Sequence, residues 1–275
     1  MKTISLLGSG AFEPWAEEVD RLALGSSSGG ARAAVLLLGA AGREADDRAD
    51  AALRHFERVG APADVVRVES RPDAFASELQ DRVDGVCLVH LSASDPAAPI
   101  RFLAGTPMWE RVLAAVDRGA AFTASGAATG ALGDAAFFED EPSARWDDWS
   151  SGLRLLEGTI IVPHWDELGR SRPEVQRFLG REAPTDETVI AIDDRTALIG
   201  DGDLWQVKGA GQVQIRIGDV WNTYGNGAAF LLPSSVTVLP EAEPERIERP
   251  ASEAIVVLSD DSDEGPTQEP DLLVG

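Results

Sequence analysis

Two side chains, Ser125 and His164, have the types and positions expected of a nucleophile and its general base. Ser125 follows the apolar stretch from Ala120 to Thr123 and precedes Gly126 and two alanines. Small residues permit the sharp strand-to-helix turn that lifts a serine Oγ above a sheet edge, beside backbone N–H groups. The same residues also suit a helix that packs tightly on a strand, so a purely structural interpretation stays open.

His164 ends an apolar run that extends from Thr159 to Pro163. An imidazole titrates near neutral pH, so it can take a proton from a hydroxyl and return it to a leaving group. Of the other two histidines, His55 lies in a helical pattern and His90 ends another apolar run. If the strands that carry His90, Ser125 and His164 run side by side, these residues meet at one edge of a parallel sheet.

Several segments, taken in order, resemble the dipeptidase E and cyanophycinase family of serine peptidases over most of Ile4 to Ile217. The segments are Leu6–Gly10 with Phe12, Ala33–Gly60, Gly152–Gly158, Val162–Asp166, Ala191–Leu198 and Trp205–Val213. The resemblance implies a class I glutamine amidotransferase-like fold. It also implies hydrolysis of aspartyl peptides or related amides, with Ser125 attacking and His164 acting as base and acid.

The strand-to-helix turn at Ser125, called the elbow below, departs from the family pattern. That pattern is glycine, any residue, serine, alanine, glycine, alanine. Matching serine to serine makes Ser125 the nucleophile but exchanges the alanine and glycine that follow. Matching the downstream helix without a gap puts Gly126 at the nucleophile position and leaves Ser125 one place early. A shift of one residue turns the side chain away from the pocket, so the two registers predict an active and an inactive site.

A second departure lies after the strand that ends near His90. The family has two glycines there that help to form the oxyanion hole, and this chain has Ala93 and Ser94. Because Cβ atoms can turn an N–H donor away from the developing oxyanion, this departure predicts a weakened or lost catalytic site.

The acid that orients His164 is predicted from an acidic loop that follows the elbow. By resemblance to the dipeptidase branch, Asp140 is the first choice, with Asp134 and Glu139 behind it. A run of charges in a loop is also commonly just solvated.

Alternating strand and helix patterns predict an α/β domain over residues 1–240, with a mostly parallel central sheet flanked by helices. The expected strands are Thr3–Gly8, Ala33–Gly39, Ala63–Val68, Gly85–Leu91, Ala120–Thr123, Thr159–Val162, Val189–Ile192, Thr196–Gly200, Leu204–Val207 and Val213–Ile217. The expected helices are Ala45–Val59, Ala74–Arg82 and Pro107–Arg118. The late strands are short and closely spaced, which predicts antiparallel hairpins.

Residues 241–275 carry eleven acidic and two basic side chains together with four prolines. Such a segment cannot bury enough apolar surface to offset its ordering entropy, so a disordered acidic tail is expected. The net charge of −23 argues against binding to nucleic acid or to an anionic membrane surface. Without an apolar run of spanning length or a leader pattern, a cytoplasmic location is expected.

Neither a cofactor nor a metal ion is expected, because the three histidines and the single cysteine form no ligand cluster of usual spacing. The predicted partner is a small peptide or amide, with a homodimer as an option. Three functions remain open at this point. The first is a hydrolase with a weakened or lost site, and the second is a non-catalytic protein that binds a small acidic or peptide ligand. The third is a structural partner whose acidic tail carries the interaction.

Overall fold

The structure is a computed structural model that describes residues 2–137, 145, 149–202, 204–233 and 236–238. The segment 241–275 lies outside the described residues, so its disorder stays a prediction. Among the described residues, no helix combines the length and the apolar character needed to cross a membrane.

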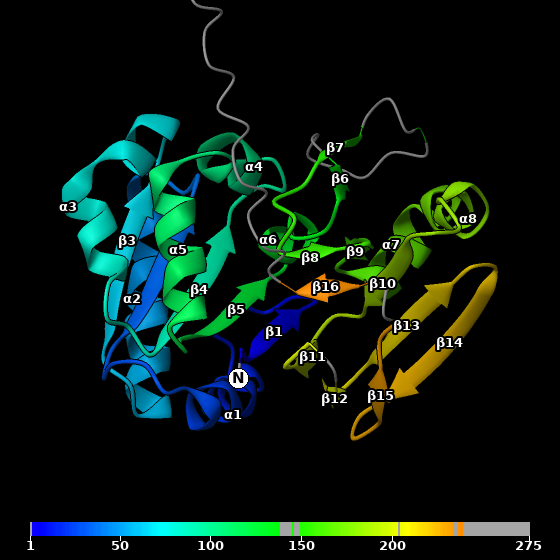
Figure 1. Cartoon of the computed structure of the whole chain (residues 1–275), viewed down its shortest axis with the longest axis horizontal. Coiled ribbons are helices and arrows are strands. Elements are labelled where there is room, and N and C mark those ends of the chain that lie inside the picture. The colour runs from blue at the N-terminus through cyan, green and yellow to red at the C-terminus, as the bar shows by residue number, and fades with distance from the viewer. Residues whose placement is uncertain (1, 138–144, 146–148, 203, 234–235, 239–275) are drawn as a thin grey trace, which may run out of the picture. The chain divides into compact units, whose positions relative to one another are not determined.

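The larger of two main sheets contains the strands that lead to the predicted site (Figure 1). Its eight strands are, in spatial order, β15 (Ala229–Leu231), β12 (Leu204–Gly209), β11 (Thr196–Gly200), β1 (Ile4–Leu7), β5 (Ala121–Ser125), β4 (Leu88–Ala93), β2 (Ala33–Leu38) and β3 (Ala63–Val68). The run from β1 to β3 is parallel, whereas β11, β12 and β15 pair antiparallel. The predicted parallel core with late antiparallel hairpins is therefore confirmed.

Helices cover both faces of the parallel strands, because alternate side chains of a strand point to opposite sides. In β2, the even-numbered residues from Ala34 to Leu38 pack in one cluster with apolar residues of α5 (Pro107–Asp117). The odd-numbered residues from Ala33 to Leu37 pack in another with α2 (Gly42–Val59) and with Ala23 of α1 (Ala16–Ser26). Strands buried on both faces explain the continuous apolar runs in the sequence.

The second sheet carries His164, which corrects the expectation that its strand lies beside those of His90 and Ser125. Its strands are β14 (Val220–Gly225), β13 (Gln212–Ile217), β10 (Thr188–Ile192), β9 (Thr159–Val162), β6 (Ala135–Phe137) and β7 (Trp149–Ser151). One face packs against α7 (Trp165–Ser171) and α8 (Pro173–Glu182), and β13 and β14 form a long hairpin (Figure 1). Alternate residues of β9 and β10 point instead into the core of the larger sheet, so the two sheets share an interior.

The remaining elements are short. They are α3 (Ser77–Gln80), α4 (Ala98–Leu103), α6 (Ala127–Gly130), the 3₁₀ helices η1 (Arg71–Phe75) and η2 (Asp81–Val83), and the strand pair β8 (Leu156–Glu157) and β16 (Thr237–Val238). The expectation of one continuous helix over Ala74–Arg82 is wrong. Ala76 adopts an extended backbone and separates η1 from α3, and α3 tightens directly into the 3₁₀ turn of η2.

Gly8 holds the end of β1 against the two segments that carry His164 and its neighbours. Its N–H donates to the Thr196 carbonyl at 2.8 Å, and its carbonyl accepts from the His164 N–H at 3.3 Å. A Cβ added at Gly8 would overlap the carbonyl oxygen of Asp193. The end of β1 can therefore pass this close to Asp193 only because residue 8 is glycine.

Replacement of Gly8 by alanine is expected to lower the free energy of unfolding by about 1–3 kcal/mol, because backbone must move to admit the methyl group. Urea unfolding followed by circular dichroism measures this loss. Gly25 in α1 is the matched control, since an added Cβ there meets nothing within 4 Å. Gly25→Ala should stabilise the helix by about 0.5–1 kcal/mol. Equal effects of the two substitutions would contradict the role given to Gly8.

Candidate functional site

Gly126 forms the turn between β5 and α6. A side chain at this position would point toward His164. The backbone angles of Gly126 are φ 54° and ψ −124°, a conformation that residues with a Cβ rarely adopt. The Gly126 N–H donates to the Leu7 carbonyl at 3.0 Å, which ties the turn to the end of β1. A Cβ built on Gly126 would lie 3.3 Å from Nε2 of His164. This contact is slightly tighter than an ordinary one, so the imidazole would shift by a few tenths of an ångström to admit a side chain at residue 126.

Ser125, the last residue of β5, points away from His164 and into the layer beneath the sheet. Strand alternation puts its side chain on the same face as Ala121 and Thr123, which is the face that α1 and α2 cover. Its Oγ lies 3.3 Å from Nε2 of His90, and the residue is only 4 % exposed. These contacts are the ones expected in the second register, and the position of the nucleophile itself stays a prediction.

His164 is held in an unusual backbone conformation with its ring paired to a carboxylate. The residue has φ 55° and ψ 35° in the left-handed region, directly before α7. Nδ1 lies 2.7 Å from Oδ1 of Asp194, which leaves Nε2 facing Gly126. The Asp194 N–H in turn donates to a carboxylate oxygen of Asp166 at 2.9 Å. An acid bonded to Nδ1 fixes the ring orientation, which is what the acid of a Ser-His-Asp triad does.

The acid beside His164 is one that the sequence interpretation did not consider. Asp140 and Glu139 lie outside the described residues, so the role predicted for Asp140 stays a prediction. Asp134 is engaged elsewhere, accepting from the Gly158 N–H at 2.6 Å. Asp194 lies in the turn between β10 and β11, directly after an apolar strand. That position at a strand end is the sequence signal that could have identified it.

A polar pocket of about 230 Å³ opens beside His164 and Gly126, which confirms that His164 and the Ser125–Gly126 turn lie close together. Its lining residues come from the ends of β1, β4 and β5, from α2 and from the segment after β9. They are Ser9, Gly10, Ala11, Arg48, Ser92, Ala93, Ser94, Ser125, Gly126, Ala127 and His164. No carboxylate is in this set, and Arg48 brings a permanent positive charge. The pocket therefore favours an anionic group.

The backbone at Ala93 and Ser94, where the family has glycines, is already engaged. The Ser94 N–H donates to the Leu38 carbonyl at 3.0 Å, and the Ser94 hydroxyl reaches the same oxygen at 3.3 Å. The carbonyl of Ala93 accepts from Nη2 of Arg48 at 3.1 Å. An N–H that is bonded within the fold has no free hydrogen to offer an oxyanion.

Beneath the pocket lies a buried group of titratable side chains. His55 Nε2 lies 2.6 Å from a carboxylate oxygen of Asp20, whose other oxygen accepts from the Thr123 hydroxyl at 3.2 Å. The ring of Phe12 contacts both His55 and His90. Burial is the main cause that lowers the pKa of His90 to about 4, with the charge of Asp20 acting in the opposite direction. An imidazole with so low a pKa is a weak base for a serine hydroxyl at neutral pH.

The low pKa of His90 makes stability depend on pH. The unfolded chain binds a proton at this histidine below about pH 6.5, whereas the folded chain does so only near pH 4. Between these values the unfolded state holds more protons, so stability rises with pH and is lost as the pH falls. The contribution of His90 should decrease by about 2 kcal/mol from pH 7 to pH 5.

Urea unfolding at the two pH values measures this effect. His90→Gln should reduce the difference between pH 7 and pH 5 by that amount. An unchanged pH dependence in His90→Gln would contradict the assignment.

One set of side chains in the described part of the structure is close enough to share a cation. Ligand atoms of His164, Glu167 and Asp194 lie within 4.8 Å of one another. The sequence argument against a metal site did not include Asp194. Glu167 is exposed and the other two are partly exposed, and exposed carboxylates commonly cluster without an ion.

Comparisons with known proteins find similarity at the level of the fold. No family model and no curated protein matches the chain. Among solved structures, a peptidase from an acI-B1 Actinobacterium is similar with a TM-score of 0.75 and 23 % identity, over 84 % of this chain and 97 % of that one. A Listeria monocytogenes structure named "Putative Peptidase E Protein" is similar with a TM-score of 0.54 and 12 % identity, over 77 % and 100 % of the two chains.

Proposed function

We propose that the chain binds a small acidic peptide or amide in the pocket beside His164 and forms no acyl-enzyme. The chain shares its fold with the two peptidase structures described above, as the sequence resemblance implied. The observation that carries the proposal is Gly126, which occupies the elbow in the conformation of a nucleophile but has no side chain to direct at His164. Without that side chain, the elbow offers no hydroxyl at residue 126 for the His164–Asp194 pair to activate.

The contacts of Ser125 support the same conclusion. Its hydroxyl lies against His90, a fully buried base with a pKa of about 4, and not against His164. The engaged Ser94 N–H removes a second part of the hydrolytic machinery. Loss of an oxyanion donor alone costs roughly a hundredfold to a thousandfold in rate, and loss of the nucleophile costs more.

The pocket itself supports a role in binding. Its wall offers serine hydroxyls and the Arg48 guanidinium, which are donors suited to a carboxylate and to amide groups. A volume of about 230 Å³ is at the small end of ligand sites, which suits an amino-acid-sized group.

Binding and turnover measured together test the proposal. Isothermal titration with aspartyl-glycine and β-aspartyl-glycine should give saturable binding, while the release of free glycine stays at the uncatalysed rate. His164→Ala, which alters the pocket wall, should weaken binding of the same peptides. If neither of the two peptides binds, the proposal is wrong.

Turnover would contradict it as well, and two variants identify the source. Activity abolished by Ser125→Ala would make Ser125 a nucleophile after all. Activity abolished by His164→Ala but retained in Ser125→Ala would indicate that the His164–Asp194 pair activates a water molecule in the space left by Gly126.

A further inference from the structure

A separate groove lies on the second sheet, between α8 and the hairpin of β13 and β14. This groove, called the α8 groove below, is lined by Trp165, Pro173, Gln176, Arg177, Gln214 and Trp221. Its volume of about 390 Å³ lies within the range of small-molecule sites. It shares no lining residue with the pocket beside His164. What the α8 groove binds is therefore independent of the function proposed above.

Strand pairing brings the floor of the α8 groove together. Across the hairpin, Trp221 pairs with Arg216, which lies two residues after Gln214 on β13. Because alternate residues of a strand point to the same side, Trp221 and Gln214 lie on one face of the sheet. Trp221 packs there with apolar residues of α7 and α8. A Cβ added at Gly180 would lie 3.6 Å from Nε1 of Trp221, so α8 forms the wall beside this indole.

Trp165 makes the indole of Trp221 a fixed platform. The two rings are stacked, with their centroids 5.5 Å apart and their planes inclined by 26°. Trp165 is only 5 % exposed, and its carbonyl accepts from Nε2 of Gln176 at 2.7 Å. Trp221 is more exposed than Trp165 and lines the groove. An indole held in this way offers a flat apolar surface to the ring of a ligand.

The polar side chains of the α8 groove suit an anion. None of the six lining residues is acidic, although 47 residues of the chain are. Within the described part of the chain, the Arg177 guanidinium forms no ion pair, and the Gln214 side chain forms no hydrogen bond. Glu174, one turn before Arg177, is paired with Arg172 at 3.1 Å. A permanent cation beside a free amide donor is suited to a carboxylate.

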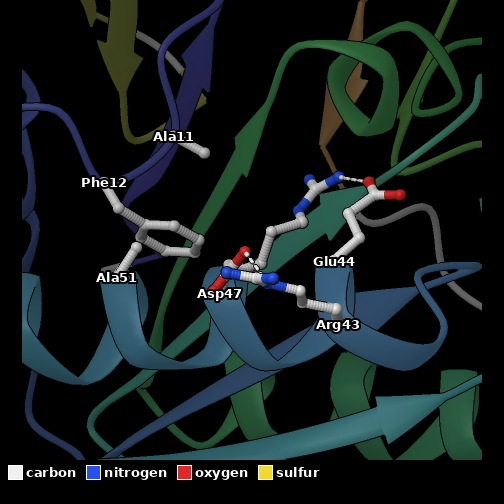
Figure 2. A pocket seen from close by; sticks show the side chains of 7 residues that line it. Ala11, Phe12, Arg43, Glu44, Asp47 and Ala51 are labelled. Atoms are coloured by element: carbon white, nitrogen blue, oxygen red, sulfur yellow. Dashed lines mark ion pairs between the residues drawn. The ribbon is translucent and has the colours of Figure 1, made fainter.

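The larger hollow along α2 lacks such an unpaired cation. Its volume is about 650 Å³, and Figure 2 shows its two arginines facing acidic side chains of the same helix. Arg43 lies 3.9 Å from Asp47, and Arg48 lies 3.5 Å from Glu44. These carboxylates already occupy the positions that a ligand anion would take. The unpaired guanidinium therefore distinguishes the α8 groove from this hollow.

We propose that the α8 groove binds a carboxylic acid carried on an aromatic ring. The ring lies against Trp221, the carboxylate pairs with Arg177, and the Gln214 amide donates a further hydrogen bond to it. Loss of the charged contact should weaken binding about tenfold, and loss of the ring contact about twofold to tenfold.

Three probe molecules separate the two contacts. Benzoate carries both the ring and the carboxylate, acetate lacks the ring, and benzyl alcohol lacks the charge. Nuclear magnetic resonance of the indole N–H groups locates the binding, because Trp221→Phe identifies the Trp221 signal by its loss. In the unmodified protein, benzoate should shift the Trp221 signal to saturation. Acetate and benzyl alcohol should each bind at least fivefold more weakly than benzoate.

Variants with matched controls assign the contacts to residues. Arg177→Gln should weaken benzoate about tenfold and leave benzyl alcohol unchanged. Arg181→Gln is its control, because it removes the same charge one turn later on α8, outside the groove. Gln214→Glu should also weaken benzoate, since it puts a like charge beside the carboxylate. Gln212→Glu, on the same face of β13 but outside the groove, should have little effect.

Several results would overturn the proposal. Benzoate that leaves the Trp221 signal unmoved, or that binds Arg177→Gln and Arg181→Gln equally, contradicts it. Binding that is weakened by Arg48→Gln and not by Arg177→Gln would put the acid in the pocket beside His164, and this also contradicts it. None of these results bears on the binding of aspartyl peptides, so this inference and the proposed function can fail separately.

Discussion

Replacing Gly126 by serine is expected to create a reactive nucleophile. The new Oγ would lie beside Nε2 of His164, whose Nδ1 is already oriented by Asp194. With an aryl fluorophosphonate, the Oγ attacks phosphorus, fluoride leaves, and the proton passes to His164. A positioned general base accelerates such a step by roughly a hundredfold to ten-thousandfold. Intact-mass spectrometry over time should show an adduct on Gly126→Ser at a rate at least a hundredfold above that of the unmodified protein.

Strain accompanies this substitution, because a residue with a Cβ at φ 54° costs about 1–3 kcal/mol. Gly126→Ala carries the same strain without a hydroxyl, so it should lower stability similarly and remain unlabelled. Gly126→Ser combined with His164→Ala should lose most of the labelling. If Gly126→Ser folds like Gly126→Ala but stays unlabelled, the elbow does not present its side chain to His164.

Removal of one partner from the buried pair of Asp20 and His55 is expected to destabilise the fold strongly. Both side chains are fully buried and lie 2.6 Å apart. His55→Leu would leave the Asp20 carboxylate in the interior with only the Thr123 hydroxyl, at a cost of about 3–5 kcal/mol. Urea unfolding at pH 7 measures this loss.

Removal of both partners is the control for the pair. The double variant Asp20→Ala with His55→Leu leaves no buried charge, so it should lose less stability than the two single variants added together. Strict additivity of the two losses would show that the pair does not act as a unit.

Much of the fold follows from hydrophobic patterning alone. The continuous apolar runs at β2, β4 and β9 predict strands buried on both faces, and the structure has them. The pattern does not say which sheet a strand joins, because pairing depends on contacts far along the chain. The strand before His164 belongs to the second sheet, which the pattern did not predict. The end of this strand nevertheless reaches Gly8 and the pocket.

The face on which Ser125 lies could have been predicted more sharply. Ala121, Thr123 and Ser125 alternate along β5, and Thr123 already bonds Asp20 in the helix-covered layer. A period of two then directs the Ser125 side chain into the same layer, away from His164. The position of Asp194 after a strand makes it a candidate, but its pairing with His164 could not be derived from the sequence. It depends on how the turn after β10 crosses the end of β1, which is tertiary geometry that no local pattern encodes.

We infer that the elbow of the unmodified protein holds no nucleophile. Peptide-level mass spectrometry of the unmodified protein, after prolonged exposure to an aryl fluorophosphonate, tests it most directly. We expect no adduct on the peptide that contains residues 124–129, under conditions that fully label Gly126→Ser. An adduct on Ser125 that His164→Ala abolishes would contradict this account and make Ser125 the nucleophile of an active hydrolase.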